Sequence, residues 1–178
     1  MRDKIVFIGV GNMGLPMAKN LVKKGKKVKV FDISNQVLNK AKKENLEVSK
    51  NFNDLFDNDV NFVISMLPEG KNSEKVYLGQ NGVIKKVTKK CLLIDCSTID
   101  MKTSIKIGNF AKKKSISMID APVSGGVMGA TNATLNIMVG GTKSAFNKAL
   151  PILKIMGKKI FHAGNIGAGN GAKICNNM

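Results

Sequence analysis

The sequence is poor in the residues that several classes of site require. Among its 178 residues it has no tryptophan, one tyrosine, one histidine and one arginine. The three cysteines (Cys91, Cys96 and Cys175) have neither the spacing of a zinc site nor that of a disulfide framework. We therefore expect no metal site, and we expect buried or half-buried thiols in a reducing compartment.

Long hydrophobic runs are also missing. No stretch reaches the roughly 18 apolar residues that a membrane-spanning helix needs, so we expect no contact with a membrane. A predicted strand begins near Lys4, which leaves no room for a signal peptide. The expected location is the cytoplasm, or a mitochondrial-type matrix if a transit peptide has been removed.

The charge is strongly one-sided, with 29 basic and 12 acidic residues and a formal net charge of +17. Such an excess is typical of nucleic-acid-binding proteins. Here, however, Arg2 is the sole arginine, and lysines are spread through residues 23–29, 85–90, 112–114 and 158–159 without interleaved tyrosine or tryptophan. We expect a solvated basic surface and no specific nucleic-acid binding, with a non-catalytic basic binding module as the alternative.

A glycine-rich turn stands between a predicted strand and a predicted helix. An apolar run at residues 5–8 leads into Gly9, Gly11 and Gly14, and an amphipathic segment follows at residues 15–24. In the βαβ unit that binds a dinucleotide, these glycines permit the tight turn, the approach of a pyrophosphate and close helix packing. An ordinary tight turn is the alternative. A mononucleotide P-loop is excluded because no Lys-Ser or Lys-Thr pair follows the glycines.

An acidic residue ends the second predicted strand, residues 28–31, about 20 residues beyond the glycines. In dinucleotide-binding units a carboxylate at this place, here Asp32, binds the ribose hydroxyls of NAD and repels the 2′-phosphate of NADP. Lys27 and Lys29 are close in sequence, but no arginine is. The pattern therefore favours NAD.

The rest of the chain alternates between predicted strands and helices. This indicates an α/β fold of the Rossmann type, a doubly wound and mainly parallel sheet. Further strands are predicted at residue 48 and at residues 60–65, 92–95, 116–121, 135–139 and 158–162. Helices are predicted at residues 35–43 (capped by Ser34), 53–56, 73–78, 103–113 and 144–156, and residues 122–126 are predicted to be a loop.

The C-terminal segment is a glycine-rich turn that runs into a further predicted helix. Lys173 and Asn177 are four residues apart and therefore lie on the same helical face. We divide the chain into a dinucleotide-binding domain at residues 1–163 and this segment at residues 164–178. A frayed terminus with an incidental lysine is the alternative.

Five sequence blocks resemble the 3-hydroxyisobutyrate dehydrogenase family of β-hydroxyacid dehydrogenases, and together they span essentially the whole chain. They are GVGNMGLPMAKNL from Gly9, MLP from Met66, DCSTI from Asp95, DAPVSGG from Asp120 and GAKICNN from Gly171. The resemblance implies oxidation by NAD of a 3-hydroxy acid to a semialdehyde. The implied substrate is 3-hydroxyisobutyrate, oxidised to methylmalonate semialdehyde, or a close analogue.

The resemblance also implies roles for individual residues. Lys173 matches the catalytic lysine, which suits the reaction because a base must take the hydroxyl proton as the hydride leaves. Asn177 matches the amide that orients the substrate, and Thr98 the residue beside the nicotinamide. His162 is a rival base that we interpret as structural. The residues that match the loop around the substrate carboxylate are Ser124, Gly125 and Gly126; those that match the cofactor site are Gly9, Gly11, Asn12, Met13, Gly14, Asp32, Met66, Leu67, Pro68, Asn72 and Thr98.

Differences from the sequence motifs of related enzyme families make a phosphorylated sugar as substrate and NADPH as cofactor less expected. 6-Phosphogluconate dehydrogenase has an acidic pair after its Ser-Gly-Gly and a histidine before its final asparagine, where this chain has Val127, Met128 and Asn176. Glyoxylate and succinate-semialdehyde reductases that use NADPH typically carry Asn-Arg where this chain has Asp32 and Ile33. A related reductase of that kind remains the alternative within the superfamily.

Members of the family continue the last helix, which we expect to begin near Ala172, into a wholly helical second domain. That domain closes the substrate cleft and supplies most of the dimer contact. We interpret this chain as a fragment that lacks it, weakly active or inactive alone, whose complete form is a homo-oligomer.

Overall fold

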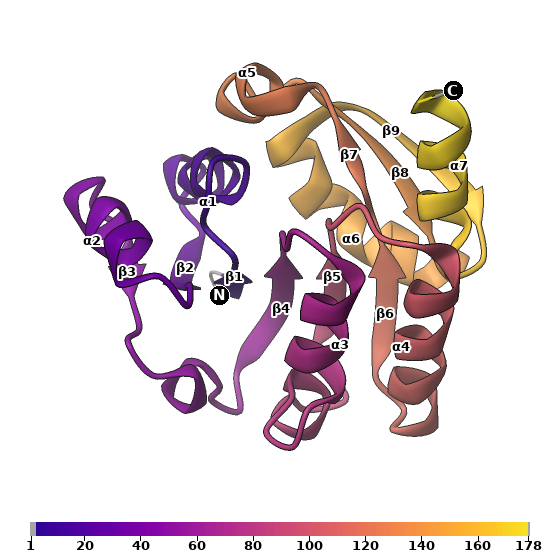
Figure 1. The fold of residues 1–178 in the computed structure, drawn as a ribbon, viewed down its shortest axis with the longest axis horizontal. Coiled ribbons are helices and arrows are strands. Elements are labelled where there is room, and N and C mark those ends of the chain that lie inside the picture. Colours follow the sequence, from indigo (N-terminus) through magenta and orange to yellow (C-terminus); the bar gives the residue numbers. More distant parts are fainter. Residues whose placement is uncertain (1–2, 178) are drawn as a thin grey trace.

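The computed structural model describes residues 3–177, except for the side chains of residues 176 and 177. Within that range a nine-stranded sheet forms the centre, and helices cover both of its faces (Figure 1). The strands are β1 (Lys4–Ile8), β2 (Lys27–Phe31), β3 (Glu47–Val48), β4 (Val60–Ser65), β5 (Leu92–Asp95), β6 (Ser117–Asp120), β7 (Val123–Ser124), β8 (Leu135–Gly140) and β9 (Gly157–Gly164). The helices are α1 (Gly14–Lys23), α2 (Asn35–Lys43), α3 (Gly70–Leu78), α4 (Met101–Lys113), α5 (Gly126–Thr131), α6 (Lys143–Met156) and α7 (Ala168–Asn177), with short 3-10 helices η1 (Phe52–Leu55) and η2 (Val83–Lys85).

The strand order confirms the predicted doubly wound fold. It runs β3-β2-β1-β4-β5-β6-β8-β7, with β9 also paired to β8. Strands β1 to β6 are parallel to their neighbours, whereas β8 runs antiparallel to β6. Because the chain steps outward from β1 in two opposite directions, a crevice is expected at the carboxyl ends of β1 and β4.

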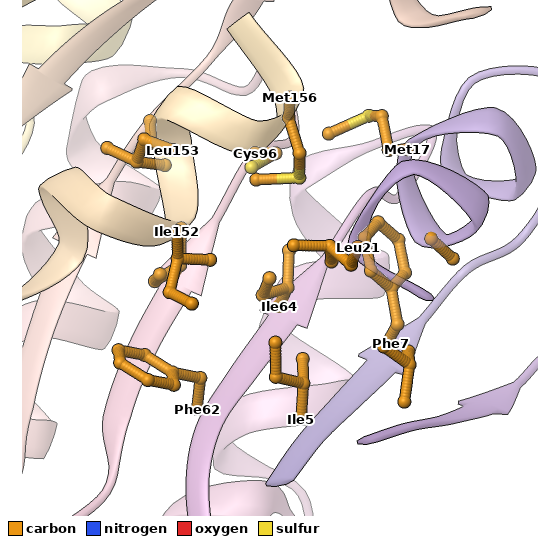
Figure 2. Close-up of a cluster of buried hydrophobic side chains, with 14 of the residues drawn as sticks. Ile5, Phe7, Met17, Leu21, Phe62, Ile64, Cys96, Ile152, Leu153 and Met156 are labelled. Carbon is orange, nitrogen blue, oxygen red and sulfur yellow. The ribbon is translucent and has the colours of Figure 1, made fainter. Parts of the chain in front are cut away.

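Two hydrophobic layers fill the space between the sheet and its helices. Successive side chains of a strand point to opposite faces, so Ile5 and Phe7 of β1 pack on one side while Val6 and Ile8 pack on the other. Figure 2 shows the first layer, in which Met17 and Leu21 of α1 meet the sheet beside Ile152, Leu153 and Met156 of α6. Helices α3 and α4 cover the opposite face. Because helices cover both faces of the sheet, the side chains on both sides of the central strands are buried, and these strands consist almost entirely of apolar residues.

Most predicted elements are confirmed to within a few residues, and the exceptions lie in four places, one of which is the 3-10 helix η2, which the sequence did not predict. Helix α3 begins at Gly70, three residues before the predicted start. The predicted loop at residues 122–126 contains strand β7 and leads into helix α5, which the sequence did not predict. Helix α7 begins at Ala168 instead of near Ala172. Strand β7 pairs with β8, and the start of α7 donates hydrogen bonds to Asp120, so both depend on tertiary contacts that their own side chains do not reveal.

The cysteine prediction holds for two of the three thiols. Cys91 and Cys96 are buried, and burial raises the pKa of Cys91 to about 12, whereas Cys175 is exposed on α7. The prediction of a buried or half-buried thiol is therefore wrong for Cys175, whose position on α7 is open to solvent. None of the helices in residues 3–177 has the length and apolar character needed to cross a bilayer.

Candidate functional site

A cavity of about 800 Å³ opens at the carboxyl ends of β1, β2 and β4. Every residue predicted to bind the cofactor lines it, except Thr98. The opposite wall was not predicted; it comes from Phe52 of η1, from Lys75 and Val76 of α3, and from the turn at residues 79–82. The glycines of that turn are its only sequence signal. The volume lies in the range of cofactor pockets, about 300–1,000 Å³.

The glycine turn has the geometry that the motif requires. Gly9 has φ +87°, and a Cβ atom there would overlap the carbonyl oxygen of Met66. A Cβ atom on Gly14 would overlap the carbonyl oxygen of Gly9, so α1 packs directly on the turn. Nothing lies within 4 Å of the Cβ position of Gly11. The backbone at Gly11 is therefore open to an incoming phosphate group, at the N-terminus of α1.

Asp32 lies in the cavity wall and is held by the backbone. Its Oδ2 accepts a hydrogen bond from the N–H of Val10 at 3.0 Å, and its Oδ1 accepts one from the N–H of Ser34 at 2.9 Å. Each carboxylate oxygen can accept a further hydrogen bond. The side chain is thus fixed in place with acceptor capacity left for a pair of hydroxyl groups.

Asn72, which also lines the cavity, has a side-chain oxygen without a hydrogen-bond partner among the described residues. The Oδ1 of Asn72 is buried and accepts no hydrogen bond from any described residue. A buried acceptor without a donor is costly to the folded state. The open backbone at Gly11 and the fixed carboxylate of Asp32 are the features of the cavity that fit the phosphates and a ribose of a dinucleotide.

The residues predicted to handle the substrate lie outside this cavity. Ser124 ends β7 half-buried, and Gly125 and Gly126 follow it with φ +131° and +61°. Lys173 is buried in α7 with 8% of its surface exposed. Thr98, predicted to lie beside the nicotinamide, is also outside the cavity and is exposed just after β5. Helix α5 and the C-terminal end of α7 lie on the side toward which β4, β5 and β6 point (Figure 1). Asn177 is in α7, but its side chain lies outside the described part of the chain.

A buried anchor for α7 escaped prediction. Asp120 at the end of β6 accepts hydrogen bonds from the N–H groups of Gly167 at 2.7 Å and Asn170 at 2.8 Å. Asn170 in turn accepts from the N–H of Ile99 at 3.0 Å and donates to the Oγ of Ser104 at 2.9 Å. Asp120 therefore acts as a remote cap for α7, which explains why the helix begins at Ala168.

Burial also governs the ionisation of this anchor. It raises the pKa of Asp120, although the hydrogen bonds from Asn170 and Gly167 oppose the shift. The same group of bonds links the segment after Thr98 to the helix that carries Lys173. A sequence signal existed only in the DAPVSGG block, where Asp120 stands first.

His162 lies in β9 and is engaged within the domain. Its Nε2 is 2.7 Å from the carbonyl oxygen of Gly141, and its ring stacks on Phe146 with centroids 5.0 Å apart. These contacts agree with a structural interpretation of this histidine.

Comparison with known proteins identifies the domain. Residues 4–164 match the family described as the NAD binding domain of 6-phosphogluconate dehydrogenase. The 3-hydroxyisobutyrate dehydrogenase of Pseudomonas aeruginosa is 46% identical over 98% of this chain, and the NAD-dependent L-serine dehydrogenase of the same organism is 41% identical over 98%. The solved structure of Mycobacterium tuberculosis 3-hydroxyisobutyrate dehydrogenase with L-serine superposes with a TM-score of 0.93 at 38% identity, covering 99% of this chain.

These relatives are longer than the chain. It spans 58% of each Pseudomonas protein and 60% of the solved chain. The match with the family model nevertheless extends over nearly all of the described residues. The chain therefore belongs to this family of NAD-binding domains, as the cofactor-binding domain of the 3-hydroxyisobutyrate dehydrogenase group of β-hydroxyacid dehydrogenases.

Proposed function

We propose that the protein oxidises a 3-hydroxy acid to a semialdehyde with NAD as the cofactor. The choice of NAD rests on Asp32, whose carboxylate is held in the cavity wall by hydrogen bonds from the N–H groups of Val10 and Ser34. A fixed negative charge favours ribose hydroxyls and repels the 2′-phosphate of NADP. The cofactor would lie on the glycine turn and against Met66, Leu67, Pro68 and Asn72.

The reaction needs a proton acceptor at the hydroxyl group of the substrate. The amine of Lys173 would take that proton, and in the reverse direction the ammonium group would return it to the carbonyl oxygen. The hydroxyl of Ser124 and the backbone N–H groups of Gly125 and Gly126 would hold the substrate carboxylate, and Asn177 would orient the substrate. NAD+, when bound, supplies the acceptor for the hydride from the carbinol carbon.

Two of the relatives are named for substrates of this class. 3-Hydroxyisobutyrate and L-serine are both 3-hydroxy acids that differ at carbon 2, and relatives named for each share 46% and 41% identity with the chain. The common part, a carboxylate and a primary hydroxyl, is what Ser124, Gly125, Gly126 and Lys173 would recognise. We expect 3-hydroxyisobutyrate to be the better substrate, in line with the higher identity.

The cofactor part is tested by titrating the chain with NADH and NADPH and following the nicotinamide fluorescence. We expect NADH to bind at least about tenfold more tightly, a difference of 1.4 kcal/mol. Equal affinities, or tighter binding of NADPH, would overturn the choice of NAD.

The catalytic part is tested with Lys173→Ala in the protein at its full natural length. Loss of general acid–base catalysis typically lowers kcat by about 10²–10⁴-fold, and we expect such a loss with 3-hydroxyisobutyrate. NADH affinity should change less than about twofold, since Lys173 lies outside the nucleotide cavity. Lys154→Ala, which removes an exposed lysine of α6, is the matched control. Unchanged turnover would refute the role of Lys173.

A further inference from the structure

A group of buried polar side chains lies behind the wall of the nucleotide cavity, and none of them was predicted to serve the site. At its centre is Asp95, the last residue of β5, with 1% of its surface exposed. Its Oδ1 accepts hydrogen bonds from the Oγ of Ser65 at 2.9 Å and from the N–H of Ser97 at 3.0 Å. Its Oδ2 is buried without a hydrogen-bond partner among the described residues. We call Asp95, Ser65, Ser97 and Tyr77 the Asp95 cluster.

One arm of the Asp95 cluster reaches the cavity wall through Ser97. The Oγ of Ser97 accepts a hydrogen bond from the N–H of Leu67 at 2.8 Å, and Leu67 lines the cavity. The side chain of Leu67 lies beside the glycine turn, since its Cδ2 would be 3.1 Å from a Cβ atom placed on Gly9. A shift of Leu67 would therefore press on the glycine turn or open a gap beside it.

The other arm reaches helix α3. The Oγ of Ser65 and the hydroxyl of Tyr77 lie 2.6 Å apart, and Tyr77 is wholly buried in α3. The same helix supplies Asn72 and Lys75 to the cavity lining. The Asp95 cluster thus joins the start of the loop after β5 to the loop after β4 and to helix α3, and the last two of these line the cavity.

We propose that Asp95 and Ser97 are positioning residues for dinucleotide binding, which hold the Leu67 wall of the cavity in its binding shape through the Ser97–Leu67 hydrogen bond. This inference rests on the proposed function only in requiring that the cavity binds NADH. Neither residue is assigned a contact with the cofactor.

The composition of the Asp95 cluster supports a role beyond packing. A buried carboxyl group with one oxygen unpartnered is expensive, and apolar residues of similar size would stabilise the sheet at least as well. Burial raises the pKa of Asp95, although hydrogen bonds from Ser97 and Ser65 oppose the shift. What an apolar residue would not supply is a rigid chain of acceptors ending on one particular backbone amide.

The first test is Ser97→Ala in the 178-residue chain, titrated with NADH at a temperature where circular dichroism shows the variant fully folded. Without its acceptor, the Leu67 amide must move to find another partner, and we expect NADH to bind about tenfold more weakly. Ser49→Ala is the matched control, because Ser49 is also buried and its Oγ donates to the carbonyl of Asn51 at 2.9 Å, outside the Asp95 cluster. The control should retain the affinity of the unmodified chain.

The second test compares two substitutions of Asp95. Asp95→Asn keeps an oxygen acceptor for Ser65 and Ser97, and we expect it to bind NADH within about threefold of the unmodified chain. Asp95→Ala removes the acceptor and should weaken binding about tenfold. Rescue by asparagine separates positioning from packing, since a packing role alone would change the stability of the fold without changing the affinity of folded molecules.

The outcomes separate the two claims. If the unmodified chain does not bind NADH, the proposed function fails; if it binds and folded Ser97→Ala binds equally well, only the positioning role fails. Should Ser97→Ala not fold, Ser97→Cys takes its place, because a thiol of similar shape is a weaker acceptor. An affinity loss below about threefold in that variant would also overturn the proposal.

Discussion

At the scale of single residues, Asp32 has the clearest expected effect on specificity. Asp32→Asn keeps one oxygen acceptor but removes the charge that disfavours the 2′-phosphate of NADP. We expect the preference for NADH over NADPH, measured by fluorescence titration of both, to fall at least about tenfold. Asp54→Asn makes the same change of net charge at an exposed position of η1 and should leave the ratio unchanged. A similar ratio in both variants would mean that net charge, and not Asp32, governs the choice.

Asp95 should make the stability of the fold depend on pH in an unusual direction. Because burial raises the pKa of Asp95 in the folded state, the folded protein binds this proton more tightly than the unfolded chain. The contribution of Asp95 to the free energy of unfolding therefore falls as the pH rises from near 3.8, the ordinary pKa of this side chain, through its pKa in the folded state. We expect Asp95→Asn to gain stability relative to the unmodified chain over that window, as measured by urea unfolding at a series of pH values.

Asp100 provides a control of opposite sign. It caps α4 by accepting from the N–H of Thr103 at 2.9 Å, and the hydrogen bonds from Thr103 lower its pKa. The contribution of Asp100 to the free energy of unfolding is present above its pKa in the unfolded chain. It is lost as the pH falls through its pKa in the folded protein. Asp100→Asn should therefore lose stability relative to the unmodified chain as pH rises. The same slope for both variants would contradict the assignment of the two shifts.

At the scale of elements, α7 depends on two glycines in different ways. A Cβ atom on Gly169 would lie 2.8 Å from the carbonyl oxygen of Asp120, whereas one on Gly171 would meet only the flexible side chain of Met101. In an open helix, Gly→Ala stabilises by about 1 kcal/mol. We expect Gly171→Ala to be neutral or stabilising and Gly169→Ala to destabilise by about 1–3 kcal/mol through overpacking, in urea unfolding. Equal effects would mean that the start of α7 is not packed as described.

Helices and strands also differ in how accurately their own residues predict where they begin and end. Helix α2 was predicted to the residue because Ser34 caps it locally, with its Oγ accepting from the N–H of Val37 at 3.4 Å. The start of α7 was not, because its cap is Asp120, 47 residues before Gly167 in the sequence. Strand β7 is two residues long and exists through its pairing with β8, so no periodic pattern could reveal it.

At the scale of the whole molecule, the net charge of +17 is the feature most open to misinterpretation. Several lysines are already paired on the surface, including Lys19 with Glu44, Lys26 with Asp3 and Lys106 with Glu74. We expect the chain to bind a short DNA duplex with Kd weaker than about 1 µM at about 0.15 M salt, without sequence preference. Tighter, sequence-dependent binding would favour the basic binding module instead.

The sequence by itself determined the outline of this protein. Hydrophobic periodicity and glycine spacing act over a few neighbouring residues, so the βαβ unit, the glycine turn with Asp32 and the doubly wound sheet were predictable from it. Only the tertiary structure decided which buried polar groups support the site. The hydrogen bonds from the N–H of Leu67 to Ser97 and from the N–H of Asn170 to Asp120 join residues 30 and 50 positions apart. Such pairs form because folding brings the carboxyl ends of separate strands to one edge, where buried amides must find acceptors.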